Sequence, residues 1–530
     1  MKILSARKRK WIEKTSSKDR SYKRFLYNRV FIFAMLVLLQ MAAAIFAAYA
    51  LVYTTKFAVY VQMALFAVQI ICVFRLINKN DRPTGKLGWI IAILLVPVVG
   101  VPSYFLYGEN RPTRKMNKKL VQAKAENSKR VKELQGERPM VQPQTRGEGL
   151  SRYLAKEWGY SAYFNGDVTY YKSGEEMFEQ MKEEIKKAEK FILFEYFIIG
   201  YGRMWKELKE LLLEKAVQGV QVRIIYDDYG CLLRLPPKYY RYLESLHENI
   251  KAMTFNHVVP IFTVRMNNRD HRKLLVIDGK VGFTGGVNIA DEYINEKSRF
   301  GYWKDTGIKI TGDAVQSFTE MFLYMWNAFR EDKEDIQKYL LPLSKETDSK
   351  VCIQPYDDSA FDAYSVGEWV YRDILNRAKK YVYIFTPYLL LDDSMRQALC
   401  DAALRGVDVR IVTPGIPDKK MTYRLTRANY DILMRAGVKI YEYTPGFIHA
   451  KSMVCDDECA VVGTINLDNR SLYLNFENAV YFSGCQAVMD VKKDCEEVFA
   501  VSELCTPENR KRSIYGRFVD AVMRIFETML

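Results

Sequence analysis

The stretch His271-Arg-Lys-Leu-Leu-Val-Ile-Asp278 decides how the chain is organised, because its spacing, His-x-Lys-x4-Asp, returns as His449-Ala-Lys-Ser-Met-Val-Cys-Asp456. Each copy is followed by a cluster of small residues that ends in asparagine, Gly285-Gly-Val-Asn288 and Gly463-Thr-Ile-Asn466. The sequence holds only four histidines, so two of them at the head of a matched pattern are hard to attribute to chance. We interpret the pair as one active site divided between two halves of the chain.

The sequence around the two motifs is duplicated as well. Ala188-Glu-Lys-Phe-Ile-Leu-Phe194 resembles the stretch that starts at Ala378 and ends at Phe385, and Gly219-Val-Gln-Val-Arg223 resembles Gly406-Val-Asp-Val-Arg410. These offsets are close to the offset between the motifs. The period is far longer than that of solenoid repeats, so it predicts two related domains that face each other.

Each half predicts an α/β sheet. Helical spacing over Glu175–Lys190 leads to the apolar run Phe191–Phe194, which is typical of a buried strand, and a second helix leads to the strand Val222–Ile225. Alternating helices and apolar strands predict a layered α/β fold. We expect a basic helix and linker over 108–149, a first domain over 150–335 and a second over 336–530 that ends in an amphipathic helix at 510–530.

Composition narrows the class of partner. The 530 residues are too many for one ordinary core and leave room for two domains beside a membrane segment. The net charge of +16 favours an anionic partner, which is a nucleic acid or a membrane rich in acidic lipid. The nine cysteines are scattered without a C-x-x-C pair, which argues against a disulfide framework and favours reduced thiols.

Three apolar runs predict a membrane region over residues 30–107. They cover about 30–52, 57–74 and 87–107, and a basic cytoplasmic arm at 1–29 precedes them. The first run is long enough to span a bilayer and too long for a cleaved signal peptide. We therefore expect a multi-pass membrane protein.

Two signals bear on which side of the membrane holds the catalytic region. Three full crossings from a cytoplasmic arm would place it outside, but the segment after the third run is basic, which argues for inside. Pro97, Gly100 and Pro102 interrupt the third run, so a broken or re-entrant hairpin would reconcile the two signals. We expect the catalytic domains at the cytoplasmic face.

The residue types in the motifs suit phosphodiester chemistry. Side chains at i and i+2 of an extended strand share a face, so each motif histidine points the same way as the lysine two residues later. One imidazole can attack phosphorus while the other protonates the leaving alcohol. Ammonium and amide groups can hold the non-bridging oxygens. The expected phosphate contacts are Lys273, Lys451, Asn288 and Asn466.

Four carboxylates accompany the histidines. Asp278 and Asp456 fall on the face opposite the histidines, and Asp278-Gly279 is a favourable hairpin turn, so these aspartates either hold turns or take part in the chemistry directly. Asp305 and Glu477 follow their histidines at comparable distances, and we expect them to orient the imidazoles.

The sequence predicts neither a metal site nor a cofactor. It contains no H-E-x-x-H or H-x-H pattern, and the lysines beside the motif histidines repel cations. A serine hydrolase is also disfavoured, because no G-x-S-x-G occurs.

With both motifs and their asparagine clusters in view, the sequence resembles the phospholipase D superfamily, whose members carry two His-x-Lys-x4-Asp motifs that meet at one site. Within it, nine stretches resemble bacterial cardiolipin synthases. They are Arg269–Lys273, Gly285–Tyr293, Trp303-Lys-Asp305-Thr, Thr386-Pro-Tyr388, Gly406–Arg410 with Tyr441-Glu-Tyr443, Phe447-Ile-His449-Ala-Lys451, Gly463–Ser471 and Asn475-Phe-Glu477. The apolar hairpin before the catalytic halves also belongs to that family's plan, whereas residues 1 to about 55 are additional.

The resemblance implies transfer of a phosphatidyl group between two phosphatidylglycerol molecules in a bacterial cell membrane, giving cardiolipin and glycerol. By similarity, His271 would form a phosphatidyl-histidine and His449 would protonate the departing glycerol. His449 would then take a proton from the second phosphatidylglycerol. The scheme requires no metal.

The motifs alone leave alternatives open. A membrane-bound phospholipase D would pass the same intermediate to water, and another phosphatidyltransferase would use a different alcohol. A nucleic-acid phosphodiesterase shares the motif, but the basic charge lies around the apolar runs, where anionic lipid explains it, so we expect no nucleic acid partner. A non-catalytic scaffold is opposed by two intact motifs. The sequence predicts no particular oligomeric state.

Overall fold

The computed structural model describes residues 56–79, 83–105, 113–136, 148–258, 267–344, 350–362 and 364–506, with isolated positions between 42 and 53 and Met523. The basic arm, most of the first apolar run and the expected C-terminal helix lie outside the described residues.

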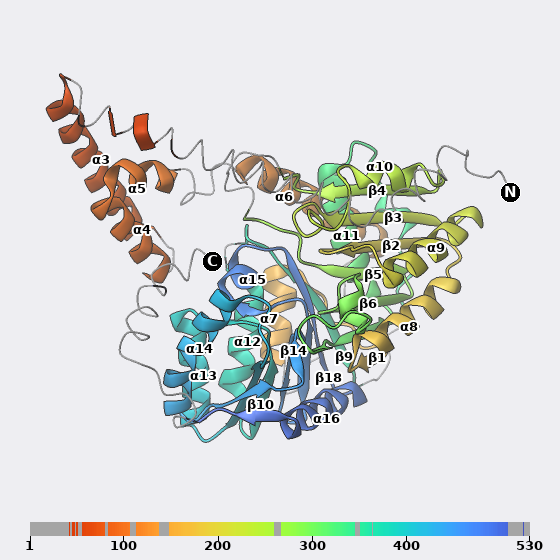
Figure 1. The fold of residues 1–530 in the computed structure, drawn as a ribbon. Coiled ribbons are helices and arrows are strands. Elements are labelled where there is room, and N and C mark those ends of the chain that lie inside the picture. Colours follow the sequence, from red (N-terminus) through yellow and green to blue (C-terminus); the bar gives the residue numbers. More distant parts are fainter. Residues whose placement is uncertain are drawn as a thin grey trace.

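The first half is built on a seven-stranded sheet with the order β1-β8-β6-β5-β2-β3-β4 (Figure 1). Its strands are β1 (Val168–Tyr171), β2 (Phe191–Tyr196), β3 (Gln221–Asp227), β4 (Ile250–Phe255), β5 (Lys273–Ile277), β6 (Val281–Gly285) and β8 (Gly307–Thr311). The strands β2, β3 and β4 pair in parallel, while β5, β6 and β8 pair antiparallel. The apolar run after Lys190 is thus a buried strand inside the sheet, and the sequence prediction of a buried strand is confirmed.

The second half repeats this order and adds one strand, giving β19-β13-β12-β10-β15-β16-β18-β9. Its strands are β9 (Cys352–Asp358), β10 (Tyr381–Phe385), β12 (Asp408–Pro414), β13 (Lys439–Tyr443), β15 (Ser452–Cys455), β16 (Cys459–Gly463), β18 (Glu477–Ser483) and β19 (Ser502–Leu504). The matching order confirms the predicted duplication. The halves face each other where β6 contacts β16 and β18.

Helices cover the sheets. They are α7 (Glu148–Trp158), α8 (Gly174–Lys186), α9 (Arg203–Val217), α10 (Tyr239–Glu244), η4 (Asp291–Ile294), α11 (Val315–Phe329), η5 (Ile336–Lys338), α12 (Val366–Arg377), α13 (Asp393–Leu404), α14 (Lys420–Arg435), α15 (Asn469–Tyr473) and α16 (Gln486–Ala500). Side-chain caps set several starts: Ser173 accepts from the Glu176 N–H and Asp392 from the Met395 N–H.

The helix α11 lies at the centre of the molecule. Twelve of its 15 residues are buried, and it contacts β5, β9 and α6 (Arg114–Gln135). The α6 side chains Met116, Leu120 and Ala123 are buried in the same core. The basic helix that the sequence predicts after the apolar runs is therefore packed against the catalytic body.

The apolar region forms a hairpin of α3 (Ala58–Asn78), α4 (Pro83–Leu95) and α5 (Pro97–Ser103) that projects from the body (Figure 1). Among the described residues, α3 is the one helix long and apolar enough to cross a membrane. The third apolar run is broken at Val96, as its prolines predict. A Cβ on Gly100 would lie 2.1 Å from the Ala92 carbonyl oxygen, so only glycine lets α5 fold back on α4.

Candidate active site

Each histidine segment pairs with the carboxylate segment of the other half. The strand β14 (Gly446–Ile448) lies parallel to β7 (Tyr302–Lys304), and the His449 N–H donates to the Lys304 carbonyl over 2.7 Å. In the same way Asp270 bridges Phe476, and the His271 N–H donates to the Phe476 carbonyl over 2.8 Å. These backbone pairings between the halves place both motifs at the boundary between them.

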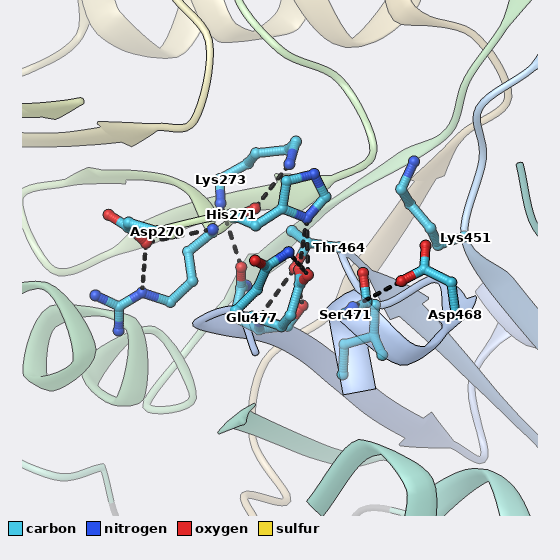
Figure 2. A network of polar contacts seen from close by, with 12 residues as sticks. Asp270, His271, Lys273, Lys451, Thr464, Asp468, Ser471 and Glu477 are labelled. Atoms are coloured by element: carbon cyan, nitrogen blue, oxygen red, sulfur yellow. Dashed lines mark hydrogen bonds and ion pairs between the residues drawn. The ribbon is translucent and has the colours of Figure 1, made fainter. Parts of the chain in front are cut away.

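The side chains follow this exchange. His271 Nδ1 lies 2.7 Å from Glu477 Oε2, and His449 Nδ1 lies 2.7 Å from Asp305 Oδ2. Figure 2 shows the His271 ring above the Glu477 carboxylate, with Lys273 on the first-half strand and Lys451 across the site. Because Nδ1 is engaged with a carboxylate in both rings, Nε2 is the nitrogen left for substrate.

Both motif lysines are buried beside the rings. The Lys273 ammonium donates to the His271 carbonyl over 2.7 Å, and the Lys451 ammonium donates to the His449 carbonyl. Burial lowers the pKa of Lys273 to about 8, and burial lowers the pKa of Lys451 to about 7. The site thus concentrates two cations that are poorly solvated and gain from an incoming phosphate anion.

The imidazoles and carboxylates are shifted by the same environment. Burial, reinforced by the two lysines, holds the pKa of His271 well below its usual value, and burial with Lys451 lowers that of His449 to about 4. Burial raises the pKa of Glu477 to about 7. The pKa of Asp305 is lowered, because its contacts with His449 and Lys451 outweigh its burial.

The small-residue clusters give the carboxylates room. A Cβ on Gly286 would lie 1.9 Å from Asp305 Oδ1 and 2.9 Å from the His449 carbonyl oxygen. In the second cluster the Thr464 hydroxyl donates to Glu477. Outside the cluster, the Asn475 amide donates to the same carboxylate over 3.1 Å. The clusters therefore hold the orienting carboxylates in place.

Aromatic rings surround the imidazoles, which sequence reasoning missed. Phe197 packs edge-on against His271 at 4.9 Å between ring centroids, while Tyr293 and Trp303 each lie 5.4 Å from His449. Trp303 stands in the segment quoted for Asp305, and Phe197 directly follows strand β2. The signal for these aromatic residues in the sequence is their position next to segments that carry site residues.

The two predicted asparagines have different surroundings. Asn288 is used within the protein, since its Oδ1 accepts from the Ile198 N–H over 3.1 Å and its Nδ2 donates to the Tyr293 hydroxyl over 2.8 Å. Asn466 Oδ1 is buried without a hydrogen-bond partner in the part of the chain that the structure describes.

The motif aspartates Asp278 and Asp456 are not brought to the histidines. The Asp278 carboxylate accepts the N–H groups of Glu189, Lys190 and Phe191 over 2.7 to 2.8 Å. Asp456 accepts those of three residues at the start of β10. They are Lys379, Lys380 and Tyr381, over the same distances. Both aspartates adopt positive φ, 54° and 53°, in the hairpin turns after β5 and β15.

Within the described ranges no group of three or more His, Cys, Asp or Glu side chains is placed to hold a metal ion. The nine cysteines are free thiols.

Comparison with known proteins gives the family. Residues 181–326 and 371–499 match the family described as cardiolipin synthase, PLD-like domain, and residues 67–109 match a phospholipase D-nuclease N-terminal family. The fold resembles the phosphatidylserine synthase of Haemophilus influenzae, with a TM-score of 0.54 and 16 % identity over 68 % of this chain and 95 % of that one.

Sequence relatives extend over most of the chain. A Streptococcus mutans protein described as uncharacterized is 42 % identical over 86 % of this chain and 99 % of its own length. Cardiolipin synthase of Alkalihalophilus pseudofirmus is 32 % identical over 85 % of this chain and 90 % of its own, and cardiolipin synthase 2 of Bacillus cereus is 33 % identical over 85 % and 88 %. Its two His-x-Lys motifs meet in one site through the pairing of segments between the halves. The chain belongs to the phospholipase D-like cardiolipin synthase family.

Proposed function

We propose that this protein is a cardiolipin synthase that transfers a phosphatidyl group from one phosphatidylglycerol to another and releases glycerol. The observation that carries the proposal is the pair of buried imidazoles, each held at Nδ1 by a carboxylate of the other half and flanked by a buried lysine. This arrangement supplies a nucleophile, a general acid and cationic phosphate contacts in one place.

In the first step His271 Nε2 attacks the phosphorus of phosphatidylglycerol. A P–N bond forms, the P–O bond to the headgroup glycerol breaks, and His449 donates its proton to the departing oxygen. Burial and Lys451 lower the pKa of His449 to about 4, because both disfavour its charged form. A bound phosphodiester anion brings negative charge beside the ring and raises that pKa. Substrate binding therefore favours the protonated His449 that acts as the general acid.

In the second step a hydroxyl of another phosphatidylglycerol attacks the phosphatidyl-histidine. His449 accepts the hydroxyl proton, the P–N bond breaks, and cardiolipin leaves with both imidazoles restored. Lys273 and Lys451 stabilise the charge on the non-bridging oxygens in both steps. We assign Asn466, whose Oδ1 has no partner among the described residues, to a headgroup hydroxyl, and Asn288 to support of the site through Tyr293.

Transfer to an alcohol rather than water is supported by the surroundings of the rings. His271 and His449 are each 8 % exposed, and Phe197, Tyr293 and Trp303 cover them. An apolar cover of this kind limits the water that reaches the intermediate and suits an acceptor that is itself a lipid.

The proposed location is a bacterial cell membrane, with the catalytic body at the cytoplasmic face. On α3 the side chains of Val59, Phe66 and Phe74 are 67 %, 63 % and 62 % exposed, which is unfavourable in water and expected in lipid. A re-entrant course of the broken helix pair α4–α5 would keep the body on the side of the membrane that the basic residues on α6 favour.

Product analysis tests the proposal. The full-length protein in neutral detergent receives phosphatidylglycerol labelled in its headgroup glycerol, and the lipids and water-soluble products are separated. The proposal predicts cardiolipin and free labelled glycerol in equal amounts. Phosphatidic acid with glycerol would show a hydrolase instead, and unchanged lipid would refute an enzyme acting on this substrate.

A further inference from the structure

A cavity outside the catalytic centre lies where the apolar hairpin meets the body. It has a volume of about 570 Å³ and is lined by the end of α3, by α5, by the start of α6 and by the loop after β9. Among the described residues that line it, three are cations, Arg75, Lys79 and Arg114, and one is a carboxylate, Asp362. The balance of charge favours an anion.

Two lining residues carry unused acceptors. Asn117 Oδ1 and Asp362 Oδ2 are buried without a hydrogen-bond partner among the described residues. Buried acceptors of this kind are costly unless a ligand supplies donors. The cavity therefore combines cations that suit a phosphate with acceptors that suit hydroxyl groups.

The cavity stands at the depth where lipid headgroups would lie. Arg75 and Lys79 are at the C-terminal end of the apolar helix α3, and the end of a membrane span meets the headgroup layer. On the inner side the lining ring of Phe361 packs on Phe476 with centroids 5.6 Å apart, and the Phe476 carbonyl accepts the His271 N–H. Two aromatic rings thus separate the cavity from the His271 segment.

From these features we infer that the cavity binds the headgroup of a phosphatidylglycerol, with the phosphate on Arg75, Lys79 and Arg114 and the glycerol hydroxyls on Asn117 and Asp362. This lipid is additional to the two that react at the histidines, and it holds the catalytic body against a membrane that contains the substrate. The inference rests on the proposed function, which supplies the identity of the lipid.

The test measures binding without turnover. The full-length His271→Ala protein in neutral detergent is titrated with phosphatidylglycerol, and retained lipids are counted by native mass spectrometry. Arg114→Gln and Asn117→Ala are added singly, and Lys115→Gln is the matched control, because Lys115 is the neighbouring exposed cation and does not line the cavity. Size-exclusion profiles and melting curves verify that each variant is folded.

We expect Arg114→Gln and Asn117→Ala each to weaken the retention of one lipid about tenfold, because each variant loses one charge-assisted or buried hydrogen bond. Lys115→Gln should retain the lipid within about twofold of its parent. Equal effects in all three variants, or none in any, would overturn the inference. So would displacement of the lipid by inorganic phosphate at the same concentration, which indicates an ion site, or equal retention of phosphatidylcholine or phosphatidylethanolamine.

The two proposals fail separately. If the unsubstituted protein makes no cardiolipin, the proposed function is wrong while the binding contrast in the His271→Ala protein is still measured. If cardiolipin forms and Arg114→Gln binds lipid like Lys115→Gln, only the cavity assignment is wrong.

Discussion

Glu477 of the second half lies 2.7 Å from His271 Nδ1 of the first half, and neither half contains both members of a histidine–carboxylate pair. Each carboxylate reaches the histidine of the other half because of backbone pairing: the segment before Glu477 pairs in parallel with the segment before His271. Each half alone would therefore lack an oriented imidazole.

Glu477→Gln tests the orienting role. The amide removes the negative charge beside His271 and does not favour the tautomer that leaves Nε2 free to attack. We expect kcat for cardiolipin formation to fall about 10²- to 10³-fold with KM within a few-fold. Glu496→Gln, a change of an exposed glutamate on α16, is the control. A Glu477→Gln enzyme with nearly parental kcat would show that the carboxylate has no part in the reaction.

Asp278→Ala tests whether the motif aspartates act through structure. The substitution leaves three backbone N–H groups without their acceptor and removes a residue that tolerates positive φ. We expect the free energy of unfolding to fall by about 2 to 4 kcal/mol. Activity per folded molecule should stay within about threefold, and Asp278→Asn should lie between the two proteins in melting temperature. A stable Asp278→Ala protein without activity would place this carboxylate in the chemistry.

The buried lysines set the alkaline limit of activity. Burial lowers the pKa of Lys273 to about 8 and the pKa of Lys451 to about 7, so both lose their charge as the pH rises through that range. We expect kcat/KM for phosphatidylglycerol to decline above about pH 7, where Lys451 loses its charge first, and kcat to decline less, because bound phosphate restores the charge. Lys451→Arg keeps its charge and should move the decline to higher pH at a lower maximum. A kcat/KM that stays constant to about pH 10 would contradict the role of these ammonium groups.

A buried ionic cluster joins α6 to the first motif, and its central carboxylate should contribute to stability. Asp357 on β9 lies 3.7 Å from Arg272, 3.4 Å from Lys124, and accepts hydrogen bonds from Tyr160 and Tyr324. We expect Asp357→Asn to lower the free energy of unfolding by about 1 to 3 kcal/mol, because the acceptor of the Tyr160 and Tyr324 hydroxyls loses its charge. Arg272 keeps its ion pairs with Glu195 at 2.5 Å and Asp270 at 3.3 Å.

The control for this cluster is Asp373→Asn, which removes a half-buried i,i+4 pair with Arg377 on α12 and should cost less than about 0.5 kcal/mol. Chemical denaturation of both variants compares the two effects. Equal losses would show that the cluster does not bind α6 and β9 to the motif strand.

Much of the fold follows from local pattern. The turn at Asp278-Gly279, the buried strand after Lys190 and the duplicated order of strands depend on periodicity and turn residues, which the sequence displays directly. The strand limits are less accurate: β5 begins at Lys273 and β15 at Ser452, so both histidines precede their strands, where they meet the other half.

The exchange of carboxylates could not be predicted from spacing. Asp305 and Glu477 follow the histidines of their own halves along the chain, yet each contacts the histidine of the other, because the docking of two domains decides the contact. The same reason hides the aromatic cover of Phe197 and Trp303 and the internal use of Asn288. Tertiary contacts of this kind carry no signal at a fixed sequence offset.

The phosphatidyl-histidine tests the central claim most directly. The enzyme is mixed with phosphatidylglycerol, quenched within one turnover and digested, and the peptides that contain His271 and His449 are weighed by mass spectrometry. We predict a phosphatidyl group on the His271 peptide that disappears when more phosphatidylglycerol is allowed to react, as cardiolipin appears. An adduct on the His449 peptide would reverse the two roles, and cardiolipin formed without an adduct on either peptide would contradict the two-step mechanism.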